Sequence, residues 1–226
     1  ERVNNELIGN YGNFVHRVMT LTHRLANGGE NPLSQFANSG DHTEFNGKID
    51  ECIREAISSM EKQRFKEALR HVMNISQAGN GYLQNAAPWK FLSADDSTER
   101  SESLSALAAC WRACRALAVL TAPFLPFQAE RLWKQLGEEG KAGDQLWDTA
   151  HDLGSELRWN DATPNPLFQR LDLDEILKNE EDVAESQQEE VNYIEFEDFL
   201  KVEMKTGRIL SVEDHPNADK LYVVTI

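Results

Sequence analysis

Residues 104–120, which read LSALAACWRACRALAVL, decide the fold. Leucine, alanine and tryptophan recur there at helical spacing, with few polar side chains between them. A helix that is apolar over most of its circumference is covered by other elements. We therefore expect a central, buried helix, with start signals at 95–98 and an end marked by Pro123 and Pro126.

Amphipathic helices are predicted on both sides of this central helix. Over residues 2–27 the apolar positions fall three or four apart, so one helix should carry a single apolar stripe that ends at the turn residues 27–29. The stripe consists of Leu7, Tyr11, Phe14, Val18, Leu21 and Leu25. Residues 43–87 show a second helical pattern with a break in the charged run 61–64, and residues 127–137 a short helix. These four or five helices predict a mainly α fold, an antiparallel helix bundle over residues 1–160.

The pattern changes after residue 160. We expect residues 161–178 to be an extended segment that packs back on the bundle. Residues 179–190 (NEEDVAESQQEE) have few apolar anchors, which predicts a flexible acidic linker, with a short acidic helix as the alternative. Residues 193–212 alternate like strands, and residues 221–226 are β-branched and apolar. Residues 191–226 are thus expected to form an incomplete β segment.

Composition restricts the class of protein. The 226 residues carry a net charge of -15, but residues 172–203 hold thirteen acidic residues and two lysines, a net charge of -11. The remaining 21 basic and 25 acidic residues give only -4, so local basic patches for nucleic acid remain possible. The mean hydropathy is -0.55 and no apolar run approaches ~18 residues, which argues against a membrane span or membrane partner.

Three cysteines, Cys52, Cys110 and Cys114, are too few for a disulfide framework and favour a cytoplasmic protein. No phosphate-binding loop, G-x-S-x-G elbow or C-x-x-C pair occurs. Cys110 and Cys114 lie one helical turn apart without a nearby histidine, and we interpret them as buried core thiols. We predict no catalytic residue, metal site or cofactor. The start at Glu1, within a helical pattern and without Met, is interpreted as a piece of a longer protein.

Polar side chains flank the stripe of the first helix. At 100° per residue, Asn10, Asn13, Arg17 and Arg24 cluster to one side of it. An amide beside a guanidinium suits the Watson–Crick edge of an unstacked base, although an ordinary solvated flank has the same pattern.

Trp89 follows Pro88, which places it at a helix junction. A tryptophan there either fills the core or offers a face on which a base stacks. The other tryptophans are assigned to the core or to interfaces: Trp111, Trp133, Trp147 and Trp159.

Four pieces resemble the anticodon-binding domain of the methionyl-tRNA synthetase family: residues 3–10 (VNNELIGN), 13–17 (NFVHR), 86–89 (AAPW) and 167–171 (LFQRL). In that family the Asn and Arg of the N-x-x-x-R pair and the Trp after Pro meet the CAU anticodon. The resemblance assigns these roles to Asn13, Arg17 and Trp89. Asn10 and Arg24 are further candidates for tRNA contact.

Three later pieces resemble the start of an OB-fold tRNA-binding module: residues 194–199 (IEFEDF), 205–209 (KTGRI) and 215–221 (HPNADKL). Such a module is appended to many methionyl-tRNA synthetases and occurs in endothelial-monocyte-activating polypeptide II. The resemblance makes Asn217 and Lys220 candidates for tRNA contact, with a turn-forming role as the alternative for Asn217, and it implies a homodimer through the complete module. An OB-fold needs about five strands, so only its start is expected here.

Together the two resemblances imply a piece of an ATP-dependent methionine–tRNA ligase. Its partners would be tRNA(Met) and the parent's catalytic domain, which would hold ATP and the catalytic residues. Two alternatives remain open. One is a non-enzymatic helical adaptor or scaffold of a synthetase assembly, and the other is the anticodon domain of a synthetase for isoleucine, valine or cysteine.

Overall fold

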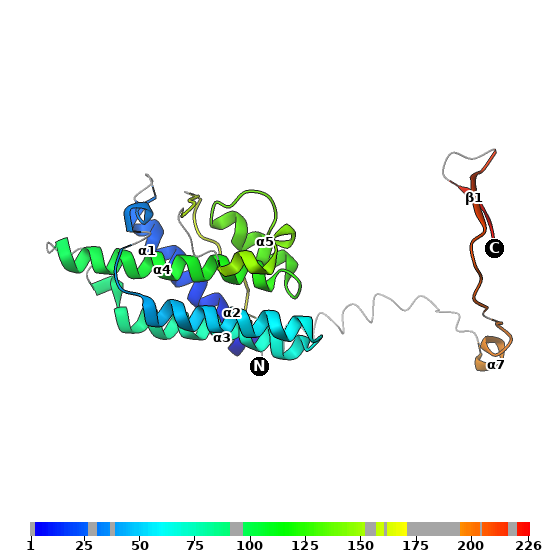
Figure 1. The fold of residues 1–226 in the computed structure, drawn as a ribbon, viewed down its shortest axis with the longest axis horizontal. Coiled ribbons are helices and arrows are strands. Elements are labelled where there is room, and N and C mark those ends of the chain that lie inside the picture. The colour runs from blue at the N-terminus through cyan, green and yellow to red at the C-terminus, as the bar shows by residue number, and fades with distance from the viewer. Residues whose placement is uncertain are drawn as a thin grey trace, which may run out of the picture. The chain divides into compact units, whose positions relative to one another are not determined.

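Helices account for the first part of the chain in the computed structural model (Figure 1). The described residues are 3–26, 31–36, 39–90, 97–151, 157–160, 162–170, 195–203, 205–216 and 221–226. The chain divides into two units, Glu1–Asp172 and Leu173–Ile226. The main helices of the first unit are η1 (Val3–Gly12), α1 (Asn13–Ala26), α2 (Thr43–Glu61), α3 (Phe65–Ala86), α4 (Ser97–Thr121) and α5 (Pro126–Gln135). Short 3-10 turns occur at Ser34–Phe36, Pro88–Lys90, Ala142–Asp144 and Trp147–His151.

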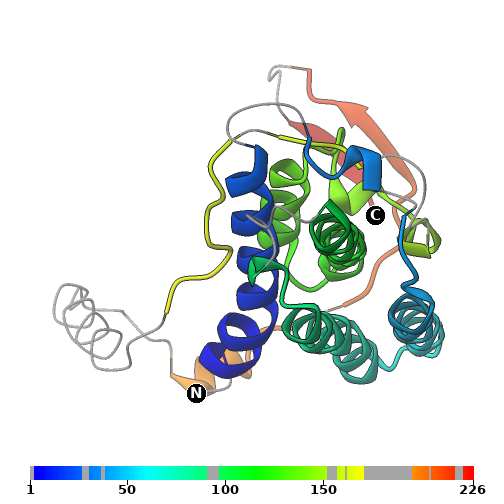
Figure 2. The same cartoon turned by 90° about the vertical axis from the view of Figure 1, so that its left-hand side faces the viewer.

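The predicted break between two helices is confirmed. α2 ends at Glu61 and α3 begins at Phe65, and Gln63 takes a positive φ of 59° in the tight turn between them. The chain therefore reverses, and α2 packs antiparallel to α3. α4 runs alongside this pair, and α1 crosses the set (Figures 1 and 2).

α4 is the central helix that the sequence predicts. Of its residues, 103–114 and 116–121 are all buried, including Trp111 at 2% exposure. Burial also raises the pKa of the Cys110 and Cys114 thiols well above their usual value. By length and composition Thr98–Thr121 could cross a membrane, which the sequence reasoning missed, but 94% of its apolar window is buried inside the unit. That burial is the property of a core helix.

The stripe of the first helix enters the same core. Tyr11, Phe14 and Val18 have no exposed surface. Phe14 lies directly against α3, since a Cβ placed on Gly79 would fall 2.4 Å from its Cζ atom. The close approach of α1 to α3 therefore depends on the missing side chain at residue 79.

Gly79 and Gly81, on the same helix, should respond oppositely to alanine. Gly79→Ala should lower the free energy of unfolding by up to about 2 kcal/mol, because overpacking costs about 1–3 kcal/mol and outweighs a helix-propensity gain of about 1 kcal/mol. A Cβ at Gly81 would meet nothing within 4 Å. Gly81→Ala should therefore raise the free energy of unfolding by about 0.5–1 kcal/mol. Urea unfolding of both variants checks this, and stabilisation by Gly79→Ala would contradict the packing described.

The segment after the bundle returns to it as an extended peptide. Leu167 is buried at 2% exposure, and the Phe168 ring meets Tyr11 edge-on with centroids 5.5 Å apart. Arg131 of α5 donates hydrogen bonds to the carbonyl oxygens of Pro166, at 2.9 Å, and Leu167, at 3.3 Å. These contacts attach residues 166–168 to the helices without regular secondary structure.

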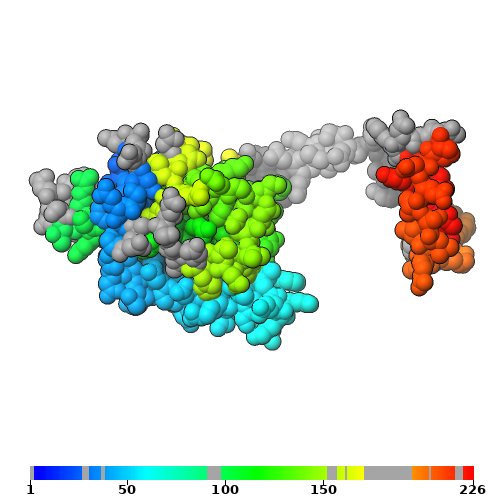
Figure 3. All heavy atoms as spheres, turned by 45° about the horizontal axis from the view of Figure 1, so that its top comes forward, coloured from blue at the N-terminus to red at the C-terminus, as the bar shows by residue number. Residues whose placement is uncertain are grey.

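The second unit contains α7 (Phe196–Phe199) and the strands β1 (Ser211–Asp214) and β2 (Tyr222–Thr225). β1 and β2 pair antiparallel, with Val212 opposite Val224. The strand-like reading of residues 193–212 was wrong at 196–199, where two phenylalanines three residues apart stack at 6.2 Å on one side of a helical turn. Among the described residues of this unit only half-buried His215 is not exposed. Figure 3 shows the described residues of this unit in orange and red.

Candidate nucleic-acid interface

The C-terminus of α3 determines where Trp89 points. Ala87 caps the helix in a left-handed conformation with φ 41°, and Pro88 then begins a 3-10 turn that directs the chain away from the helix axis. Pro88 itself is buried. Trp89 remains 37% exposed, so its side chain is not buried in the core.

Arg17 of α1 covers Trp89. Its guanidinium carbon lies 5.1 Å from the centroid of the Trp89 ring, within the range of a cation–π contact. Its Nη2 atom donates to Oε1 of Gln84 on α3 at 3.3 Å. A depression of about 260 Å³ opens here, lined by His16, Arg17, Thr20, Leu21, Arg24 and Trp89. Three basic side chains and one indole thus surround a hollow at the surface.

Asn13 lies one turn before Arg17 and is exposed. Its Nδ2 atom donates to Oδ1 of Asn80 on α3 at 3.3 Å. The polar pair Asn13 and Arg17, spaced by four residues, therefore meets a second pair with the same spacing, Asn80 and Gln84. The structure brings Arg17, Arg24 and Trp89 together around the depression and places Asn13 beside it.

Asn10 has a different environment. It is half-buried and donates to the carbonyl oxygen of Met73 at 3.2 Å. Residues 3–12 form a π-helix, whose hydrogen bonds run from i to i+5, so a wheel of 100° per residue does not hold before Asn13. Asn10 therefore turns toward α3. Asn217 and Lys220 lie outside the described residues.

Residues 42–193 match the family model described as the anticodon-binding domain of tRNA ligase. The chain belongs to this family. The match covers well over half of the 226 residues and includes α2 to α5 and Trp89.

Curated relatives of this family member confirm the resemblance seen in the sequence. The methionine–tRNA ligase of Methanopyrus kandleri is 32% identical over 231 residues, covering 100% of this chain and 33% of that protein. The methionine–tRNA ligase of Flavobacterium johnsoniae is 33% identical over 260 residues, covering 100% and 36%. The chain spans about a third of the length of these relatives.

A solved structure shares the fold. The free form of Mycobacterium tuberculosis methionyl-tRNA synthetase superposes with a TM-score of 0.63 at 20% sequence identity, covering 76% of this chain and 34% of that one. The predicted mainly α class is thereby confirmed.

The sequence analysis did not identify Asn80 and Gln84. These two residues bond to Asn13 and Arg17, which the sequence analysis did identify. Their spacing of four residues on α3 repeats that of Asn13 and Arg17. The repeat was visible, but nothing in one sequence says that these helices adjoin in register.

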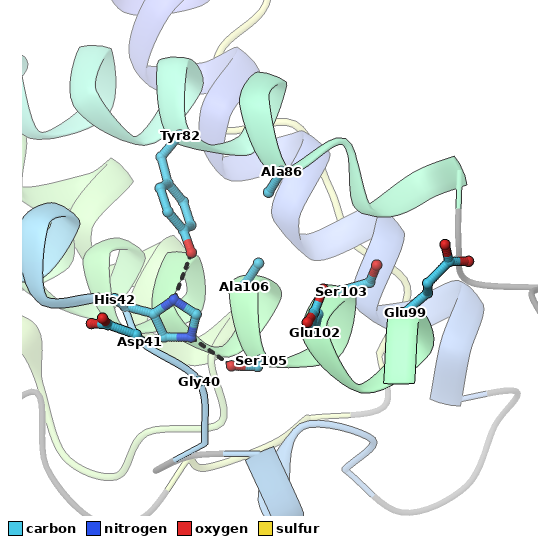
Figure 4. Close-up of a pocket in the computed structure, with 10 residues that line it drawn as sticks. All are labelled: Gly40, Asp41, His42, Tyr82, Ala86, Glu99, Glu102, Ser103, Ser105 and Ala106. Atoms are coloured by element: carbon cyan, nitrogen blue, oxygen red, sulfur yellow. Dashed lines mark hydrogen bonds between the residues drawn. The ribbon is translucent and has the colours of Figure 1, made fainter. Parts of the chain in front are cut away.

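A second hollow, of about 470 Å³, is lined by His42 and its neighbours (Figure 4). Tyr82 OH lies 2.7 Å from Nδ1 of His42, whose Nε2 contacts the Ser105 hydroxyl. Ser105 in turn donates to the carbonyl oxygen of Ser39. Burial raises the pKa of Tyr82 to about 12 and lowers the pKa of His42. The hydroxyl hydrogen of Ser105 is bonded to a backbone carbonyl, so the Ser105 hydroxyl is not activated as a nucleophile. These hydrogen bonds instead attach the 39–42 loop to α3 and α4.

Within the described ranges, no group of three or more His, Cys, Asp or Glu side chains is arranged to hold a metal ion. Cys52, Cys110 and Cys114 are free and buried.

Proposed function

We propose that this chain binds the anticodon loop of a tRNA, with Asn13, Arg17 and Trp89 meeting the CAU bases, as part of a methionine–tRNA ligase. The observation that carries the proposal is the Arg17 guanidinium lying over the half-exposed Trp89 ring at 5.1 Å. The guanidinium lies over the ring and Trp89 keeps 37% exposure, so an unstacked base would stack on the part of the indole left uncovered and accept hydrogen bonds from the N–H donors of Arg17.

Family membership and the names of the relatives support this proposal over a non-enzymatic adaptor. The ATP-dependent joining of methionine to tRNA(Met) would be carried out with a catalytic domain outside these 226 residues, in the cytoplasm. Arg24 lines the depression and is proposed as a further contact with tRNA. Asn10 bonds to Met73 and Asn80. It would therefore affect tRNA binding indirectly, by holding Asn80, which bonds to Asn13.

For residues 191–226 we propose the start of an OB-fold tRNA-binding module. One antiparallel pair of strands supports this, and the exposure of its apolar side chains shows that the pair alone builds no core. About five strands would be needed. Homodimerisation through the complete module stays a prediction.

Binding of the chain to RNA stem-loops tests the proposed function. We expect a CAU loop to bind more tightly than a loop with the same bases in scrambled order. Arg17→Ala should weaken CAU binding by about tenfold or more and should affect the scrambled loop less, because only contacts to base edges carry sequence information.

Arg54→Ala is the matched control, since Arg54 is an exposed arginine on α2 and does not line the depression. It removes the same charge and should weaken both loops slightly and equally. Equal losses for both loops in Arg17→Ala would show that Arg17 meets only phosphate. No preference of the unaltered chain for CAU would overturn the proposed function.

A further inference from the structure

Three asparagine amides, from η1, α1 and α3, form a hydrogen-bonded relay where these helices meet. Asn13 Nδ2 donates to Asn80 Oδ1 at 3.3 Å. Asn80 Nδ2 donates to Asn10 Oδ1 at 3.2 Å and to the Asn10 backbone carbonyl at 3.0 Å. Asn10 Nδ2 donates to the carbonyl oxygen of Met73 at 3.2 Å. The relay thus runs from an exposed side chain to the backbone of α3.

The ends of the relay fix the direction of every amide in it. An amide can usually rotate by half a turn and exchange its oxygen and nitrogen, and only its partners decide between the two states. A backbone carbonyl can only accept, so Met73 requires the nitrogen of Asn10, and the Asn10 oxygen must then face Asn80. Asn80 therefore directs its side-chain nitrogen to Asn10, where the Asn10 backbone carbonyl also accepts a hydrogen bond from it. The side-chain oxygen of Asn80 then faces Asn13 and accepts from the Asn13 nitrogen.

We infer that Asn80 is a positioning residue that makes Asn13 present its side-chain oxygen, a hydrogen-bond acceptor, to an anticodon base. Asn13 is exposed, and no described residue donates a hydrogen bond to its Oδ1. The inference rests on the proposed function, because it names which atom of Asn13 meets the base.

An outward acceptor selects one class of base. Cytosine carries an exocyclic amine at N4 and adenine one at N6, and both donate to a carbonyl oxygen. Uracil and hypoxanthine carry a carbonyl at the corresponding atom and would place oxygen against oxygen. Asn13 therefore favours an amine-bearing base, which is C or A of CAU, because that base bonds to the outward oxygen, whereas its carbonyl counterpart has only the second N–H of the Asn13 amide to accept from.

Three stem-loops test this, with the anticodons CAU, UAU and CIU, in which U or inosine replaces one amine by a carbonyl. The unaltered chain should bind at least one substituted loop about tenfold or more weakly than CAU. In Asn80→Ala the Asn13 amide is free to rotate, so this ratio should fall to about threefold or less. Asn85→Ala removes an exposed asparagine of the same helix that lines a different hollow, and it should keep the full ratio. Circular dichroism confirms that the variants are folded.

A further variant leaves Asn80 in place and tests the Asn13 side chain itself. Asn13→Ala removes the acceptor and should lose the preference for the amine-bearing base. Should Asn13→Ala keep the preference, or should folded Asn80→Ala keep the full ratio while the unaltered chain prefers CAU, the inference is overturned and the proposed function stands. Failure of the unaltered chain to prefer CAU over scrambled loops removes both.

Discussion

Phe14→Ala should lower the free energy of unfolding of the helical unit by about 3–5 kcal/mol. Phe14 has no exposed surface, and its ring fills the space that Gly79 leaves on α3. A glycine backbone has no side chain that could move into the gap, so the loss of burial adds to the cost of a cavity. Urea unfolding followed by circular dichroism measures the change.

Phe127→Ala is the control for Phe14, because Phe127 is 78% exposed. The same deletion of a phenyl group at the surface should change the free energy of unfolding by no more than about 0.5 kcal/mol. Equal unfolding midpoints for Phe14→Ala and the unaltered chain would show that α1 does not pack as described.

Trp89→Ala should weaken binding of a CAU stem-loop by about tenfold to a hundredfold, because stacking on an aromatic side chain contributes about 1–3 kcal/mol per base. The substitution also removes the ring over which the Arg17 guanidinium lies. Trp89→Phe keeps an aromatic face and should recover most of the affinity. Fluorescence anisotropy of a labelled stem-loop measures all three proteins.

Phe65→Ala gives a matched loss of an aromatic side chain, since Phe65 is 56% exposed at the far end of α3. It should bind CAU as the unaltered chain does. A Trp89→Ala protein with undiminished affinity would mean that no base stacks on Trp89.

The helices were predictable because each one satisfies a local rule. Phe14 and Val18 fall on one stripe, and the charged run 61–64 interrupts the second helical pattern where the chain turns. α5 begins at Pro126, one residue before the predicted start, because proline lacks an N–H group and has a helical φ that suit the first position of a helix. Such features are decided by residues within one or two turns of each other, and one sequence contains all of them.

The candidate site was predictable only in part. Asn13, Arg17 and Trp89 were selected by spacing and resemblance, and their assigned contacts with the anticodon remain predictions. The partners Asn80 and Gln84 depend on the register between α1 and α3, which is set by the fit of Phe14 against Gly79. The π-helical start, which turns Asn10 inward, breaks the periodicity on which the reasoning relied.

The place of α4 in the sequence affects how the protein is synthesised. α1 packs on α3 and α4, yet α1 ends at Ala26 and α4 ends at Thr121, 121 − 26 = 95 residues later. A ribosome adding about 5–20 residues per second needs about 5–20 s to cover that distance. During this interval the apolar face of α1 has emerged, but α4, one of the two helices on which it packs, is not yet complete. Nascent chains of this length should therefore bind chaperones that recognise apolar helices, and should release them once α4 has left the exit tunnel.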